Sequence, residues 1–265
     1  MDMYQDFAYV YDELMDNTPY EEWADFLAEI IEKYGVSKPE RDAEGLLDSE
    51  RNLVLDLGCG TGTLTELLYQ KGYDMIGVDN SESMLGIAME KRDESGDEIL
   101  YLHQDMRELE LYSTIGTVIC VCDSLNYLLE EEELLKTFSL VNNYLYPGGI
   151  FIFDFNTDYK YREVIGDTTI AENRDDCSFI WENFYDPEEE INEYNVTVFV
   201  KEEEDLFRRF TETHLQRGYR LEQMKRLVEQ AGMTVIEVLD ADTHREVTAQ
   251  SERIYVVARE QGKDL

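Results

Sequence analysis

Three closely spaced glycines form a turn whose composition suits ligand binding. Gly58, Gly60 and Gly62 follow the apolar run 53–57, and leucines at helical spacing follow the glycines. Because glycine has no Cβ, a ligand can lie directly against the backbone of such a turn. The stretch therefore predicts a buried strand, a tight loop and a helix, with the ligand site at the loop.

An acid at the end of a second predicted strand narrows the kind of ligand. Asp79 ends the largely apolar run 73–79, about twenty residues beyond the first glycine, where a carboxylate can accept hydrogen bonds from both ribose hydroxyls. The spacing Gly-x-Gly-x-Gly differs from the G-x-G-x-x-G pattern of nicotinamide enzymes, because Thr63 stands where their third glycine would be. A nicotinamide-dependent oxidoreductase is therefore the less favoured alternative.

Further motifs between residues 50 and 156 resemble, in the same order, the nucleotide-binding motifs of class I S-adenosylmethionine-dependent methyltransferases. These are Asp56-Leu-Gly-Cys-Gly-Thr-Gly62, Gly77-Val-Asp-Asn-Ser-Glu-Ser-Met-Leu85, Gln104-Asp-Met-Arg107, Cys122-Asp-Ser-Leu-Asn-Tyr-Leu128 and Pro147-Gly-Gly-Ile-Phe-Ile-Phe-Asp154. The opening Phe7-Ala-Tyr-Val-Tyr-Asp12 and the strand-rich insert after residue 156 are similar to a small-molecule branch that includes sugar-amine N-methyltransferases. The resemblance implies in-line methyl transfer from S-adenosylmethionine to a nitrogen or oxygen atom of a small-molecule acceptor. A protein that binds S-adenosylmethionine without turnover, as a regulatory module, is the main alternative.

The resemblance also implies which residues hold the cofactor. Asp79 is expected at the ribose and the pair Asp105–Met106 at the adenine, whereas Asp56 either lines the pocket or only orients the glycine loop. The full set of predicted cofactor-binding residues is Tyr11, Asp56, Gly58, Cys59, Gly60, Gly62, Asp79, Asn80, Met84, Asp105, Met106 and Asp123. The aromatic residues Tyr9, Tyr11, Tyr20 and Trp23 either cover the sulfonium by cation–π contact or belong to the core.

Residues after the fourth predicted strand are candidates for the acceptor side. Asn126 and Tyr127 follow that strand, where the methyl group and its acceptor must meet, although both could merely pack a loop. Sugar-amine relatives have a histidine where Tyr127 stands here, so no general base is carried over. His214 is a third catalytic candidate, with a purely structural role as the alternative.

The order of predicted elements indicates an α/β fold with a doubly wound, mostly parallel seven-stranded sheet and an antiparallel β insert. Strands and helices alternate between residues 51 and 155, whereas stretches 178–186, 191–200 and 206–217 alternate with period two. A helix from Leu221 and two strands then return the chain to the sheet. The expected division is an N-terminal helical arm (1–50), a cofactor-binding core (51–156), a substrate lid (157–220) and a return to the sheet (221–265).

The amino-acid composition limits the kinds of molecule that the protein can bind. The formal net charge of −37 over 265 residues argues against binding a nucleic-acid backbone, which requires clustered lysines and arginines. Four unevenly spaced cysteines indicate no disulfide framework, and the three histidines lack metal-ligand spacing. Without a signal peptide or a long apolar run, a cytoplasmic protein is expected, and the exposed edges of the β insert suggest a homodimer.

Overall fold

Two β-sheets organise the protein in the computed structural model, which describes residues 8–39, 49–203 and 206–263. The core sheet has seven strands in the order β10-β11-β5-β4-β1-β2-β3, and β11 runs antiparallel to both of its neighbours. Its strands are β1 (Leu53–Leu57), β2 (Asp74–Asp79), β3 (Leu100–His103), β4 (Ile115–Cys120), β5 (Leu145–Asn156), β10 (Met233–Asp240) and β11 (Arg253–Glu260). The predicted mostly parallel, seven-stranded sheet is confirmed.

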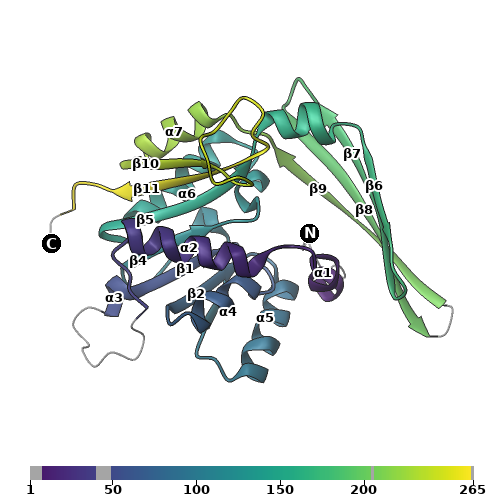
Figure 1. The fold of residues 1–265 in the computed structure, drawn as a ribbon, viewed down its shortest axis with the longest axis horizontal. Coiled ribbons are helices and arrows are strands. Elements are labelled where there is room, and N and C mark those ends of the chain that lie inside the picture. The colour runs from purple at the N-terminus through teal and green to yellow at the C-terminus, as the bar shows by residue number, and fades with distance from the viewer. Residues whose placement is uncertain (1–7, 40–48, 204–205, 264–265) are drawn as a thin grey trace.

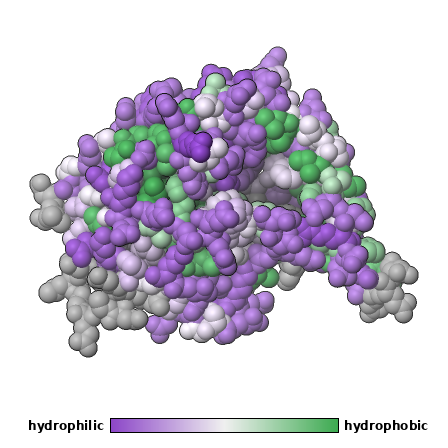
Figure 2. All heavy atoms as spheres, in the orientation of Figure 1, coloured by the Kyte–Doolittle hydropathy of each residue, from purple (hydrophilic) through white to green (hydrophobic). Residues whose placement is uncertain are grey.

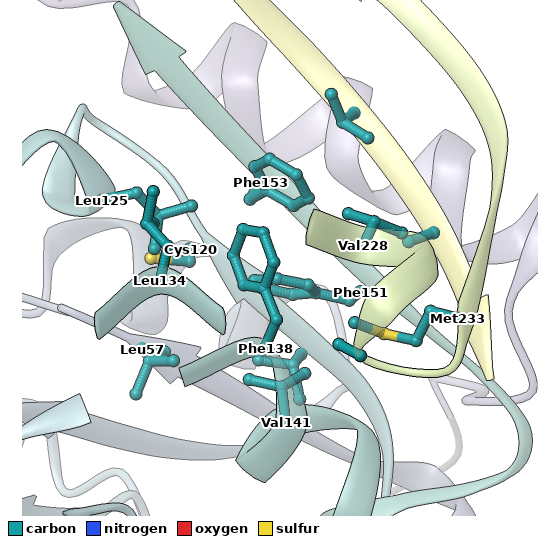
Figure 3. Packing of buried hydrophobic residues seen from close by; sticks show 14 of the residues in the cluster. Leu57, Cys120, Leu125, Leu134, Phe138, Val141, Phe151, Phe153, Val228 and Met233 are labelled. Atoms are coloured by element: carbon teal, nitrogen blue, oxygen red, sulfur yellow. The ribbon is translucent and has the colours of Figure 1, made fainter. Parts of the chain in front are cut away.

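Helices cover both faces of the core sheet because each central strand is apolar on both faces. One face packs against α2 (Tyr20–Tyr34), α4 (Thr63–Gln70) and α5 (Glu82–Ser95). The other packs against α6 (Glu131–Tyr144) and α7 (Leu221–Gln230). On that second face Phe138 of α6 lies against Phe151 and Phe153 of β5, with ring centroids 5.6 and 5.2 Å away (Figure 3). Burial on both faces fixes the strand ends that form the site.

The insert is a separate four-stranded antiparallel sheet that projects from the core (Figure 1). It follows the π-helix η3 (Lys160–Ile165) and consists of β6 (Thr169–Asn173), β7 (Cys177–Asp186), β8 (Ile191–Glu203) and β9 (Leu206–Arg217). The sequence predicted the last three strands but missed β6, which is short and largely exposed and so lacks an apolar signature. The homodimer through this insert stays a prediction.

A short N-terminal helix, α1 (Ala8–Leu14), bridges the core and the insert (Figure 1). Its buried Val10 packs against Tyr194, Val196 and Val198 of β8, three side chains that share one face of the insert sheet by the period-two pattern. The helix also contacts α5 of the core. It is therefore placed to carry its own side chains to the boundary between the two sheets.

The face of the molecule drawn in Figure 2 is largely hydrophilic, with hydrophobic residues gathered in separate patches. This agrees with an excess of 60 acidic over 23 basic residues. No helix in the described part of the chain is long and apolar enough to cross a membrane.

Candidate active site

The glycine loop lies at the carboxyl end of β1 and is held by β2. The backbone N–H groups of Gly58 and Cys59 donate to the Val78 carbonyl at 2.7 and 3.0 Å. The N–H of Gly60 donates to Oδ2 of Asp79 at 2.8 Å, and the N–H of Ser81 donates to Oδ1 at 2.8 Å. Burial raises the pKa of the Asp79 carboxyl, opposed by these backbone donors. A carboxylate offers about four lone-pair positions, so Asp79 keeps acceptor capacity for a ligand hydroxyl beside its backbone donors.

The three glycines serve different purposes. A Cβ on Gly60, whose φ is +55°, would meet no atom within 4 Å, so this backbone borders open space. A Cβ on Gly58 would lie 2.6 Å from Oγ of Ser124. A Cβ on Gly62 would collide with the Tyr101 hydroxyl, so this glycine allows close packing and does not line the cavity. Its predicted contact with the cofactor is thus not supported.

One cavity of about 470 Å³ joins the glycine loop to the insert. Most of the predicted cofactor-binding residues line it: Tyr11, Asp56, Gly58, Cys59, Gly60, Asp79, Asn80, Met84, Asp105 and Met106. Tyr127 lines it as well, together with Leu128, Leu129 and, from β9, Thr213 and Leu215. Gly62, Asp123, Asn126 and His214 are not among the lining residues.

Asp56 lies deep beneath the glycine loop. It is 2% exposed, and the Thr65 hydroxyl of α4 donates to its Oδ2 at 2.6 Å. Burial raises the pKa of this carboxyl to about 7, and the neighbouring Asp79 adds to the rise. The residue thus touches the cavity and also ties β1 to the helix that starts at the loop.

Asp105 is engaged by an arginine that sequence reasoning did not select. It precedes the 3₁₀ helix η1 (Met106–Glu108), and Oδ1 accepts from the backbone N–H of Arg107 at 2.8 Å. The Arg107 guanidinium forms an ion pair with Oδ2 at 2.6 Å and another with Glu133 at 2.5 Å. Hydrogen bonds from Arg107 lower the pKa of Asp105, so an ionised acceptor faces the predicted adenine position. The adjacent Gln104-Asp-Met-Arg order was the only available signal for Arg107.

Aromatic rings from the N-terminal helices close one side of the cavity. Tyr11 comes from α1, and Tyr20 and Trp23 come from α2, with the latter two rings in edge contact at 5.5 Å. The Arg253 guanidinium lies over the Trp23 ring, 4.5 Å from its centroid. The side chain of the remaining aromatic candidate, Tyr9, lies outside the described residues.

Asp12 fastens α1 to the cofactor loop and so positions Tyr11. The Thr61 hydroxyl donates to Oδ1 of Asp12 at 2.6 Å, and Lys91 of α5 forms an ion pair with the same carboxylate. Sequence reasoning missed this contact because the residues are far apart in the chain.

The loop after β4 has a strained backbone that a buried acid holds in place. Cys122 and Asp123 have φ angles of 65° and 55°, and their N–H groups donate to the Asp154 carboxylate at 3.0 and 2.8 Å. Non-glycine residues rarely adopt positive φ, and such strain needs surrounding support. Asp154 is completely buried and lies 3.6 Å from the Arg253 guanidinium. This arrangement positions the 3₁₀ helix η2 (Ser124–Tyr127) beside the cavity, which Ser124 and Tyr127 line.

The predicted catalytic residues have different surroundings. Tyr127 borders the cavity, and its hydroxyl lies 2.7 Å from the Tyr194 hydroxyl and 3.3 Å from Nδ1 of His214. The structure thus brings Tyr127 and His214 together although 87 positions separate them.

Asn126 and Asp123, by contrast, fasten the core to the insert. Asn126 is fully buried; its amide donates to the carbonyls of Asn156 and Arg217, and its Oδ1 accepts from the Asn156 N–H. With every amide group committed to backbone, Asn126 is not placed to act on an acceptor. Asp123 accepts from Gln216 Nε2 at 2.6 Å. These placements do not support the predicted catalytic and cofactor roles.

The described residues hold no group of three or more His, Cys, Asp and Glu side chains arranged to bind a metal ion. The chain's four cysteines are free thiols, at positions 59, 120, 122 and 177.

The cavity fits the cofactor implied by the sequence motifs, because the open backbone of Gly60 and the carboxylates of Asp79 and Asp105 all line it. Residues 54–149 match the family model described as a methyltransferase domain. The methyltransferase-family protein YqeM from Bacillus subtilis (strain 168) is 36% identical over 97% of this chain and 97% of its own length.

Solved structures agree with this assignment. An S-adenosylmethionine-dependent methyltransferase from Clostridium acetobutylicum ATCC 824 is 30% identical, with a TM-score of 0.81 over 98% of this chain and 99% of that one. The sugar N-methyltransferase KedS8 from Streptoalloteichus sp ATCC 53650 has a TM-score of 0.74 over 96% of this chain and 93% of that one, at 16% identity, and so shares the fold. Together with the glycine loop and Asp79, these matches show that the chain belongs to the class I S-adenosylmethionine-dependent methyltransferase family.

Proposed function

We propose that this methyltransferase acts on a nitrogen or oxygen atom of a small-molecule acceptor that binds between η2 and β9. The observation that carries the proposal is the continuous cavity that reaches from Gly60 and Asp79 to Tyr127 and Leu215. Its volume of about 470 Å³ lies within the usual range of small-molecule sites. The insert of residues 157–220 serves as the substrate lid, since β9 supplies part of the wall.

Three groups of residues form the half of the cavity that we assign to the methyl donor. Asp79 accepts the ribose hydroxyls, the Gly60 backbone leaves room for the ligand, and Asp105 with Met106 meets the adenine. When bound, S-adenosylmethionine supplies a methyl group activated by a positively charged sulfur. The rings of Tyr11 and Tyr20 line the cavity and suit that charge, because aromatic rings attract cations.

The acceptor half is largely uncharged. Its lining residues Tyr127, Leu128, Leu129, Thr213 and Leu215 carry no ionic side chain. Arg107 is the one cation among the described residues that line the cavity, and it is paired with Asp105 and Glu133. An acceptor with a phosphate group would therefore lack a free cationic partner, and a neutral molecule or an amine fits better.

Placement accounts for most of the chemistry that the protein must supply. Holding donor and acceptor in line can lower the barrier by about 7 kcal/mol or more in favourable model systems. A base contributes only if the acceptor arrives protonated, typically about 10²–10⁴-fold. Residues that hold the cofactor should therefore matter more to turnover than a base.

A screen of small acceptors with isotopically labelled S-adenosylmethionine tests the proposal. We expect labelled product from uncharged hydroxyl compounds or amines, identified by mass spectrometry, and no transfer to RNA or DNA. Binding of S-adenosylmethionine without turnover across the library would favour the regulatory alternative. Transfer to a phosphorylated acceptor in preference to its unphosphorylated counterpart would contradict the acceptor class.

A further inference from the structure

A buried histidine connects the Tyr127 hydroxyl to a carboxylate of the insert. His214 is 2% exposed, and its Nδ1 lies 3.3 Å from the Tyr127 hydroxyl. Its other ring nitrogen, Nε2, lies 3.6 Å from Oε2 of Glu212, whose side chain is 16% exposed. The two ring nitrogens thus face a phenol on the cavity side and a carboxylate on the insert side.

The Tyr194 ring fixes the orientation of this histidine. It stacks on the imidazole with centroids 4.9 Å apart and planes 18° apart, while its hydroxyl lies 2.7 Å from that of Tyr127. Tyr194, Glu212 and His214 are on one face of the insert sheet, because Tyr194 pairs with His214 and residues two apart share a face. Three side chains thus face the imidazole from different elements: Tyr127 from η2, Tyr194 from β8 and Glu212 from its own strand.

A carboxylate beside one imidazole nitrogen favours the tautomer that carries its proton there, which leaves the other nitrogen as an acceptor. With its proton on Nε2, toward Glu212, the imidazole presents Nδ1 as the acceptor for the Tyr127 hydroxyl. The distance of 3.3 Å is long for such a bond, but catalytic hydrogen bonds commonly shorten when substrates bind.

We propose that Tyr127, His214 and Glu212 form a proton relay that takes up the acceptor's proton during methyl transfer. The inference rests on the function proposed above and assigns it an acceptor that still carries its N–H or O–H proton. The acceptor lone pair forms the new bond to the methyl carbon, and the S–CH₃ electron pair stays on sulfur as a neutral thioether. The acceptor proton passes to Oη of Tyr127 as the tyrosine's own proton moves to Nδ1 of His214. Glu212 stabilises the resulting imidazolium, so Glu212 and Tyr194 are positioning residues.

The relay predicts a specific histidine tautomer in the protein without substrate. Long-range ¹H–¹⁵N correlation spectra distinguish Nε2–H from Nδ1–H imidazoles, and the chain has only three histidines, so His214→Gln identifies the signal by its loss. We expect the Nε2–H tautomer. Observation of Nδ1–H would overturn the relay, because Nδ1 could not then accept from Tyr127.

Two substitutions of Glu212 separate charge from hydrogen bonding. Glu212→Gln keeps an acceptor for the Nε2 proton but removes the negative charge, so the tautomer should persist while kcat falls by about ten-fold. Glu212→Leu should also abolish the tautomer preference. In both variants the donor Kd and the acceptor KM should stay within about two-fold, whereas a merely structural role would change them together.

Glu202→Gln is the matched control, since it removes one exposed charge from β8 at the end of the insert sheet far from the cavity. Unchanged kcat in Glu212→Gln, or an equal loss in the control, would overturn the proposal. The tautomer measurement needs no acceptor, so failure of the acceptor screen would refute the proposed function and leave the relay geometry to be judged separately.

Discussion

The two sheets of this methyltransferase differ in how they are buried. Every residue of β4 in the core is buried, as expected for a strand covered by helices on both faces. In β9 of the insert most side chains are exposed, and burial is confined to positions such as His214 and Gln216 near the core. The far end of the same strand exposes Leu206 and Phe207. Burial therefore stabilises the core strand along its whole length, whereas in β9 burial is limited to the end that meets the core.

Polar contacts rather than apolar packing join the two regions at the site. Asn126 bonds to the backbone at both Asn156 and Arg217, and Gln216 links Asp123 to the hydroxyl of Tyr161. Such directional contacts fix the end of β9 relative to η2. We infer that the core determines donor binding and that the insert completes the acceptor side.

The largest effect should come from a buried acid of the core. Asp154→Ala leaves the N–H groups of Cys122 and Asp123, and the nearly buried Arg253, without their carboxylate. We expect the free energy of unfolding to fall by about 3–5 kcal/mol, measured by urea denaturation. Asp25→Ala, which breaks an exposed ion pair with Lys71, is the control and should cost at most about 1 kcal/mol. Equal losses in the two variants would contradict the distinction between buried and exposed acids.

Gly60→Val tests the donor side of the core directly. The valine would place its side chain in the open cavity at a positive φ, so S-adenosylmethionine affinity should drop by about 100-fold or more, near 2.7 kcal/mol. Titration calorimetry measures the loss, and an unchanged circular dichroism spectrum confirms the fold. Gly86→Ala in α5 is a suitable control, because its new Cβ would also meet nothing within 4 Å but is outside the cavity lining.

Asp79→Ala should have a somewhat smaller effect on the same binding step. Loss of two hydrogen bonds to an ionised acceptor weakens donor binding by about 1.5–3 kcal/mol. Titration calorimetry measures the change, and Asp93→Ala is the control because the Asp93 side chain on α5 is exposed. A folded Asp79→Ala protein with the parental dissociation constant would remove this residue from the ribose site.

Asp56 should make stability depend on pH. The pKa of Asp56 in the folded protein is about 7, above the ordinary 3.8. Its contribution to the free energy of unfolding is therefore fully present below about pH 4 and is lost as the pH rises to about 7. The slope is at most about 1.4 kcal/mol per pH unit. Buried Asp79 and Asp154 act in the same direction, so only part of the slope belongs to Asp56. Asp56→Asn should flatten the curve of unfolding free energy between pH 4 and 7, and an unaltered slope would contradict an elevated pKa.

The core was largely predictable from the sequence because its signals are local. The run 53–57 with its glycines, and Asp79 at the end of the next strand, each fall within one supersecondary unit. By contrast, β6 has no apolar alternation, since almost all its residues are exposed. The strand was therefore invisible to pattern analysis.

Contacts between distant elements could not be predicted either. Asp12 accepts a hydrogen bond from Thr61, 49 positions away in the chain, and Glu212 is connected to Tyr127 only through His214. Neither contact produces a periodic pattern in the sequence. The predicted role of Asn126 lacks structural support for a related reason. It adjoins Tyr127 in sequence, but the tight 3₁₀ helix η2 directs its amide to the core–insert boundary, and no sequence pattern predicts that direction.

The most direct test of the division between donor and acceptor sides is the Tyr127→Phe variant. It removes one hydroxyl, keeps the ring in the cavity wall, and leaves the glycine loop untouched. We expect kcat with an acceptor that the enzyme methylates to fall by about ten-fold or more, while S-adenosylmethionine affinity stays within about two-fold. Parental turnover in Tyr127→Phe, or a matching loss of donor affinity, would contradict the account.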